Sequence, residues 1–150
     1  MAKQKKENKA MGPEITQDPD RLDNAVDLTT VKPGEHKVRY LGKNSGTDKN
    51  GNPYFQARLE ISGDPYTKDF TYFLGMPSQY DEAKQMNQKK TKIKDFCLAF
   101  GVQPPATLAE FNALMESGDL VGMEAWAVLN EKDNDEYGMQ NEVKRFIKPV

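Results

Sequence analysis

The sequence has little of the chemistry that most catalytic and metal sites use. It contains one cysteine, Cys97, and one histidine, His36, in 150 residues. A lone cysteine forms no internal disulfide, and no Cys/His cluster is present to hold zinc. A reducing cytoplasmic compartment is therefore the simplest setting.

Long apolar runs are also missing. No stretch approaches the roughly 18 residues that cross a bilayer, and the N-terminus has no apolar signal core. We therefore expect no membrane contact and no secretion. The sequence also lacks a P-loop and a dinucleotide-binding fingerprint.

The remaining candidates for catalysis or metal binding are weak. A Ser-His or Cys-His nucleophile would have to use His36, at the edge of a strand. Cys97 lies on an apolar helical stripe that is typical of a core. The acidic run 133–136 lacks the glycine and the distal glutamate of a calcium loop. We therefore expect a protein that is not an enzyme and needs no cofactor or metal.

The charge is unevenly distributed along the chain. The formal net charge is −2, but eleven basic and six acidic side chains lie between His36 and Lys94. The segment Asp95–Val150 has four basic and ten acidic side chains. An anionic ligand would be favoured at the basic middle of the chain.

Residues 1–30 have the composition of a tail. They are polar, contain Gly12-Pro13 and Asp18-Pro19, and have too few apolar residues to offset the entropy of ordering. We expect a disordered or loosely docked tail over 1–30 and one domain over 31–150. The lysines of the first ten residues could touch phosphate, although a solubilising role is the preferred interpretation.

Five segments have the period-two alternation of half-buried strands. Helical spacing occurs between the third and fourth of them, with Ser78 and Asp81 as the predicted cap of the first helix and a Thr107/Glu110 capping box for the second. The first helix would bury a stripe from Tyr80 to Phe100 and expose its lysines. The predicted strands are His36–Lys43, Tyr54–Ile61, Thr67–Leu74, Val121–Leu129 and Gly138–Ile147.

The order β-β-β-α-α-β-β predicts an all-β fold with a helical insertion, specifically a five-stranded OB-fold-like barrel. In that fold, strands two and three form the ligand platform, flanked by the loops that join strands one and two and strands four and five. Both loops are predicted to be long and polar here, over Asn44–Pro53 and Asn130–Glu136. A loop longer than its hairpin requires often has a functional role.

Four short motifs stand out along the predicted domain. They are Pro33-Gly34-Glu35, Lys49-Asn50-Gly51-Asn52-Pro53-Tyr54, Phe96-Cys97-Leu98-Ala99-Phe100-Gly101-Val102 and Tyr137-Gly138-Met139-Gln140-Asn141-Glu142-Val143. These motifs resemble those of phage-encoded OB-fold proteins of replication and recombination, several of which are taken to bind single-stranded DNA. The resemblance extends over about Val31–Lys148 and implies single-stranded DNA, and replication or recombination proteins, as partners, with the host cytoplasm as the setting. Unlike many such proteins, this sequence ends in basic residues and lacks an acidic tail.

Single strands bind where cations follow a groove and aromatic rings stack on bases, each stack contributing roughly 1–3 kcal/mol. Tyr54, Phe73 and Trp126 lie on the predicted polar faces of their strands, although ordinary packing would also explain each ring. The candidate nucleic-acid-binding residues are Lys37, Arg39, Lys43, Lys49, Tyr54, Arg58, Lys68, Phe73 and Trp126.

Two functional hypotheses remain. The first is a single-stranded DNA-binding protein without base-specific readout. The alternative is an OB-like protein-interaction or virion-associated structural domain, favoured by the acidic net charge and the modest number of platform cations. An exposed edge on the last strand would allow pairing with another copy, so a homo-oligomer stays open.

Overall fold

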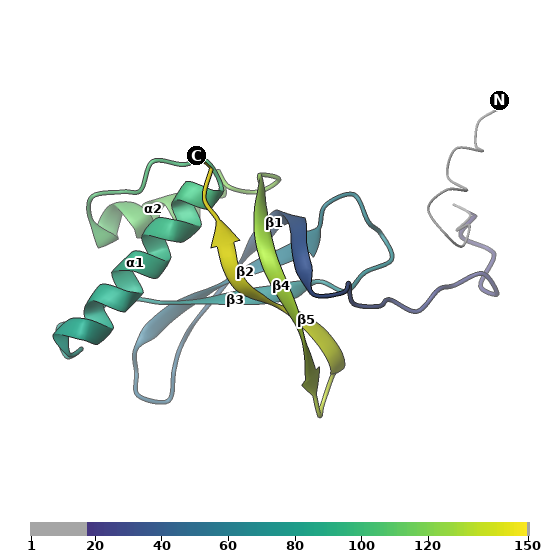
Figure 1. The fold of residues 1–150 in the computed structure, drawn as a ribbon, viewed down its shortest axis with the longest axis horizontal. Coiled ribbons are helices and arrows are strands. Elements are labelled where there is room, and N and C mark those ends of the chain that lie inside the picture. The colour runs from purple at the N-terminus through teal and green to yellow at the C-terminus, as the bar shows by residue number, and fades with distance from the viewer. Residues whose placement is uncertain (1–17, 150) are drawn as a thin grey trace.

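The computed structural model describes residues 18–149 (Figure 1). They form an antiparallel sheet with two helices inserted between the third and fourth strands. The prediction of an all-β fold with a helical insertion is confirmed at this level. Residues 1–17 of the predicted tail lie outside the described residues. The elements are β1 (Gly34–Thr47), β2 (Pro53–Ile61), β3 (Phe70–Gly75), α1 (Ala83–Ala99), α2 (Leu108–Ser117), β4 (Glu124–Asn134) and β5 (Gly138–Ile147).

The five strands pair in the order β3-β2-β1-β4-β5, so β1 is central and β3 and β5 are at the two ends. The sheet is strongly twisted (Figure 1), which brings its two ends toward each other. The rings of Tyr72 on β3 and Phe146 on β5 meet edge to face, with centroids 4.9 Å apart. The two end strands therefore share one part of the core.

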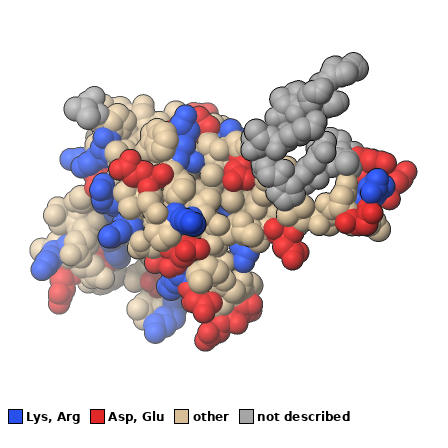
Figure 2. All heavy atoms as spheres, turned by 45° about the vertical axis from the view of Figure 1, so that its right-hand side comes forward, with Lys and Arg blue, Asp and Glu red and all other residues tan. Residues whose placement is uncertain are grey.

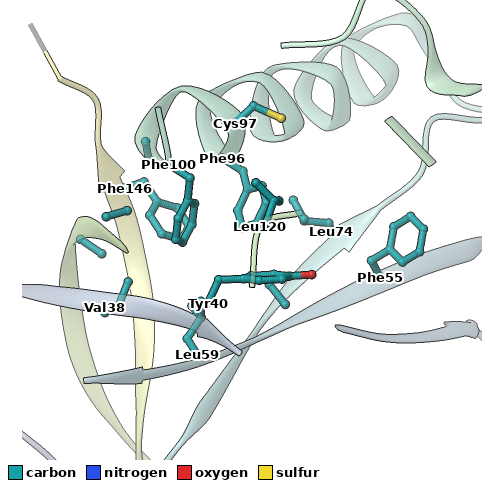
Figure 3. Close-up of a cluster of buried hydrophobic side chains, with 14 of the residues drawn as sticks. Val38, Tyr40, Phe55, Leu59, Leu74, Phe96, Cys97, Phe100, Leu120 and Phe146 are labelled. Atoms are coloured by element: carbon teal, nitrogen blue, oxygen red, sulfur yellow. The ribbon is translucent and has the colours of Figure 1, made fainter. Parts of the chain in front are cut away.

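The core lies between one face of the sheet and α1 (Figure 3). Tyr40 of β1 contacts Phe96 and Phe100 of α1 edge to face, at centroid distances of 6.2 and 6.1 Å. Edge-to-face ring pairs stabilise a fold by more than the burial of their apolar surface alone. Cys97 is fully buried beside them, as predicted. We call the opposite face of the sheet, away from the helices, the outer face.

The segment Thr29–Val31 joins the two ends of the sheet. The Thr29 N–H donates to Tyr66 O, and the Thr29 carbonyl accepts from the Lys68 N–H just before β3. On the other side, the Asn141 side chain of β5 accepts from the Val31 N–H at 2.9 Å and donates to the Val31 carbonyl at 3.0 Å. These bonds hold this part of the chain between β3 and β5.

The two long polar loops predicted from the sequence are instead hairpin arms. β1 continues to Thr47 and β4 continues to Asn134, so only short turns remain. The Asp48 carboxylate accepts from the N–H groups of Asn50 and Asn52 and closes the first turn. Because none of the residues 44–47 of β1 and 130–134 of β4 is buried, they do not alternate between apolar and polar as half-buried strands do.

The start of the first helix was also predicted wrongly. α1 begins at Ala83, and its N-cap, Glu82, makes no side-chain capping bond. Ser78 and Asp81 form a turn before the helix, because the Ser78 N–H donates to the Asp81 carboxylate and the Tyr80 N–H donates to the Ser78 hydroxyl. Tyr80 is 85% exposed and is not part of the buried stripe.

The second helix and the fourth strand follow the sequence more closely. The predicted Thr107/Glu110 capping box is present, and Gly118 ends α2 with φ 76°. The strand begins later than predicted, at Glu124, because Val121 and Gly122 lie in a turn. Val121 is therefore exposed instead of facing the core.

Candidate nucleic-acid interface

The outer face of β2 and β3 carries the clearest group of candidate residues. Cross-strand pairs place Gln56 opposite Phe73 and Arg58 opposite Thr71. Since side chains alternate between the two faces of a strand, Tyr54, Gln56 and Arg58 share this face. The structure thus brings together three of the predicted site residues, Tyr54, Arg58 and Phe73, which we call the platform.

Tyr54 and Phe73 form an aromatic pair on the platform. Their ring centroids are 5.0 Å apart and the rings are tilted by 38°. Phe73 is 46% exposed. Tyr54 has glycine as its cross-strand neighbour on both sides, Gly46 on β1 and Gly75 on β3, so no neighbouring side chain covers the pair from these two positions.

Arg58 supplies the positive charge of the platform. It is exposed, and its cross-strand neighbours, Gly42 and Thr71, are uncharged. Among residues 18–149, no carboxylate forms an ion pair with it. The guanidinium is therefore available to an anionic ligand.

Lys43 does not share a face with Lys37 and Arg39, although the period-two alternation of the predicted strand His36–Lys43 puts all three on one face. A bulge between Tyr40 and Gly42 adds one residue to β1 and shifts the pairing with β2. Because one extra residue moves every later side chain to the other face, Lys43 lies on the helix side. There its ammonium is 5.5 Å from the centre of the Phe55 ring and 3.1 Å from the Glu116 carboxylate of α2.

Lys37 and Arg39 lie on the outer face, but acidic partners compensate their charge. Arg39 contacts the carboxylates of Glu60 at 3.0 Å and Glu124 at 3.3 Å, and Lys37 is 3.9 Å from Glu124. The Ser62 hydroxyl first, and then Arg39 and Lys37, keep the pKa of the Glu124 carboxyl below its usual range. This network leaves little free charge on β1 for a ligand.

The other predicted residues lie away from the platform. Lys68 donates to the Met139 carbonyl at 2.9 Å and so joins the chain before β3 to the β4–β5 hairpin. Trp126 is 48% exposed on β4, with the Lys37 ammonium 5.7 Å from its ring centre. Lys49 is exposed in the β1–β2 turn.

Sequence reasoning missed Lys92. The helical pattern assigned it to a solvated face, but it is half-buried, and its ammonium is 4.6 Å from the Tyr72 ring centre and 5.7 Å from that of Phe73. Burial lowers the pKa of this ammonium. The one available signal was its position a helical turn before Phe96, which directs its stem toward the core.

Lys89 is also packed rather than solvated. Its ammonium contacts the Asp81 carboxylate at 3.0 Å and the Met76 carbonyl at 3.4 Å. The Ser78 N–H is the main cause of the lowered pKa of Asp81, and Lys89 adds to it. Lys89 therefore attaches the start of α1 to the chain that follows β3, and Lys90 and Lys94 remain exposed as predicted.

Basic and acidic side chains are interspersed over the side of the molecule in Figure 2. In residues 18–149, no three His, Cys, Asp or Glu side chains gather in a way that could hold a metal ion. No helix in the same range combines the length and apolarity that crossing a bilayer requires.

Comparison with known proteins adds no family. No protein-family profile matches the sequence, and no curated protein is significantly similar to it.

Proposed function

We propose that this protein binds single-stranded nucleic acid, DNA in particular, on the platform of Tyr54, Phe73 and Arg58. The observation that carries the proposal is an aromatic pair on the outer face of the sheet. The Arg58 guanidinium, which has no ion-pair partner among residues 18–149, lies on the same face. Bases would stack on the rings and Arg58 would neutralise phosphate. Such binding is tolerant of sequence, because every base has a π-face.

Several features support an OB-like barrel as the framework of this site. The strand and helix order agrees with that fold, Tyr72 and Phe146 bring the end strands together, and Thr29–Val31 bonds to both ends. Ligands of OB-folds bind over the second and third strands, which here carry the platform. The resemblance to phage-encoded OB-fold proteins supports DNA as the ligand and a role in replication or recombination.

Fluorescence anisotropy with oligo-dT at several salt concentrations tests the proposal. The wild-type protein should bind with an affinity that falls as salt rises. The double variant Tyr54→Leu/Phe73→Leu keeps apolar side chains on the strands and should lose roughly 1–3 kcal/mol of binding free energy per stacked base.

Tyr80→Leu is the matched control, because Tyr80 is 85% exposed but lies in the turn before α1. It should bind as the wild type does. Absence of binding at low salt would refute the proposal, and so would equal affinities of the platform double variant and the wild type.

One observation favours a protein-interaction domain as the second candidate. Glu60 and Glu124 compensate Lys37 and Arg39, and Trp126 is exposed beside this network. A balanced network around an exposed aromatic residue suits a protein surface better than a nucleic acid. A pull-down with and without nuclease separates the two candidates. A protein partner that stays bound after nuclease treatment, together with no affinity for oligo-dT, would favour the interaction domain.

A further inference from the structure

A groove of about 440 Å³ lies between α1 and β5, next to the platform. Lys92 and the amides of Asn87 and Gln88 line it from α1, and Lys144 and Arg145 line it from β5. Lys144 and Arg145 are exposed. The groove therefore combines three cations with neutral hydrogen-bonding groups.

The cations of this groove have no acidic partners among residues 18–149. The one carboxylate in the lining, Asp95, is 3.3 Å from the Lys148 ammonium and is compensated by it. Lys92 is also half-buried, and a partly desolvated cation without a counter-charge is costly. An anion in the groove would supply the missing charge.

Lys92 connects the groove to the platform. Its ammonium lies close to both Tyr72, which lines the groove, and Phe73, which belongs to the platform. β3 is at one end of the sheet, so a nucleic-acid strand stacked on Phe73 has to pass only β3 itself to reach the groove. The Lys92 ammonium lies between the two surfaces.

We propose that the groove between α1 and β5 holds the phosphodiester backbone of the single strand that stacks on Tyr54 and Phe73. The inference rests on the proposed function and extends it. Lys144 and Arg145 contact phosphates, and the side-chain amides of Asn87 and Gln88 donate hydrogen bonds to phosphate oxygens. Lys92 lies between the bases that stack on the platform and the part of the backbone that occupies the groove. The bound strand is thus longer than the platform alone would hold.

The test compares two double variants that remove the same charge. Lys144→Gln/Arg145→Gln changes the groove, and Lys90→Gln/Lys94→Gln changes two exposed lysines that line a different hollow, between α1 and α2. Binding is measured against salt with oligo-dT of about 6 and about 16 nucleotides, near the limits of single OB-fold site sizes. Thermal unfolding of both variants checks the fold, and Lys92→Met provides a second change in the groove.

The salt slope is the steepness with which the logarithm of the binding constant falls as the logarithm of the salt concentration rises. For the longer oligonucleotide, the groove variant should reduce this slope by about 1.4, because each phosphate contact of a single strand contributes roughly 0.7. The shorter oligonucleotide and the control variant should show wild-type slopes. An equal decrease of the salt slope in both double variants would show that the effect comes from net charge alone, and it would overturn the inference. Unchanged slopes in the groove variant would overturn it while leaving platform binding intact, whereas a wild type that binds no oligo-dT would refute both proposals.

Discussion

Tyr54 lies directly against the backbone of its cross-strand partner Gly46. A β-carbon at residue 46 would be 2.7 Å from the phenolic oxygen of Tyr54 and 2.9 Å from the ring carbon that carries it. Such contacts are too short to persist, so the absence of a side chain at Gly46 sets the position of the ring. The pairing of Tyr54 with Phe73 depends on this position.

The variant Gly46→Ala should displace the Tyr54 ring and weaken binding to oligo-dT severalfold. Its effect on stability should stay within about 1 kcal/mol, because the ring can move and alanine is favoured over glycine in a strand by roughly 0.5–1 kcal/mol. Thr47→Ala, at an exposed position on the same strand but on its other face, is the control. Anisotropy and urea unfolding measure the two effects, and unchanged affinity in Gly46→Ala would show that the ring position does not matter.

Arg58 and Arg39 should behave differently although both lie on the outer face. Arg58→Gln removes a cation that has no ion-pair partner in the described part of the chain, so the salt slope of binding should fall by about 0.7 with little change in stability. Arg39→Gln leaves Glu60 and Glu124 without their shared partner, so it should lower stability by up to about 1 kcal/mol and leave the slope unchanged. Equal slopes in the two variants would contradict this assignment.

The sequence predicted the faces of the strands better than their lengths. Alternation placed Val38, Tyr40 and Ala57 in the core, where the structure has them, because burial on one face forces period two. Residues 44–47 and 130–134, at the ends of β1 and β4, are not buried, so their polar sequences resembled loops. Turn bonds such as those of Asp48 with Asn50 and Asn52 define the hairpin arms.

The candidate site was only partly predictable for a related reason. Alternation placed Tyr54, Arg58 and Phe73 on one face, but it could not reveal the bulge between Tyr40 and Gly42 that moves Lys43 to the other side. The partners of Lys37, Arg39 and Lys68 come from distant parts of the chain. Strand register and long-range contacts determine them, and a local pattern contains neither.

Asn141 should be important for stability, because it is the one buried polar side chain in the described core. It bonds to both backbone groups of Val31 and to the Asn130 carbonyl. Asn141→Ala would leave these groups unpaired, and we expect a loss of about 2–3 kcal/mol and faster hydrogen exchange at the Val31 amide. Asn112→Ala, at an exposed helical position, should change neither, and equal urea midpoints for the two variants would argue against this role.

Stability should fall at alkaline pH because of two phenols, that of Tyr40, which is buried, and that of Tyr72, which is partly buried. Burial raises the pKa of Tyr40 and of Tyr72 from 10.0 to about 12. Since the folded pKa exceeds the unfolded one, this stabilisation is complete below pH 10 and is lost as pH rises toward about 12. Urea unfolding across that window should show the loss, and Tyr72→Phe should reduce it. A wild-type stability that stays constant across this window would contradict the expectation.

Lys92 should reduce stability at neutral pH. Burial lowers the pKa of its ammonium from 10.5, so the unfolded chain holds this proton more tightly than the folded chain does. Stability then rises with pH between the folded pKa and 10.5. Lys92→Met keeps an apolar stem over Tyr72 and removes the charge, so it should be more stable than the wild type at neutral pH. This advantage should shrink as pH approaches 10.5.

The same substitution should weaken binding, because Lys92 contributes charge where the platform meets the groove. Lys94→Met is the control, since Lys94 lies on the same helix but is exposed. Urea unfolding at two pH values and anisotropy with oligo-dT give both readouts. If Lys92→Met is more stable than the wild type and has a lower salt slope, and Lys94→Met shows neither change, then the cation at residue 92 lowers stability and strengthens binding. A Lys92→Met protein less stable than the wild type at neutral pH would instead assign the residue a packing role over the Tyr72 ring.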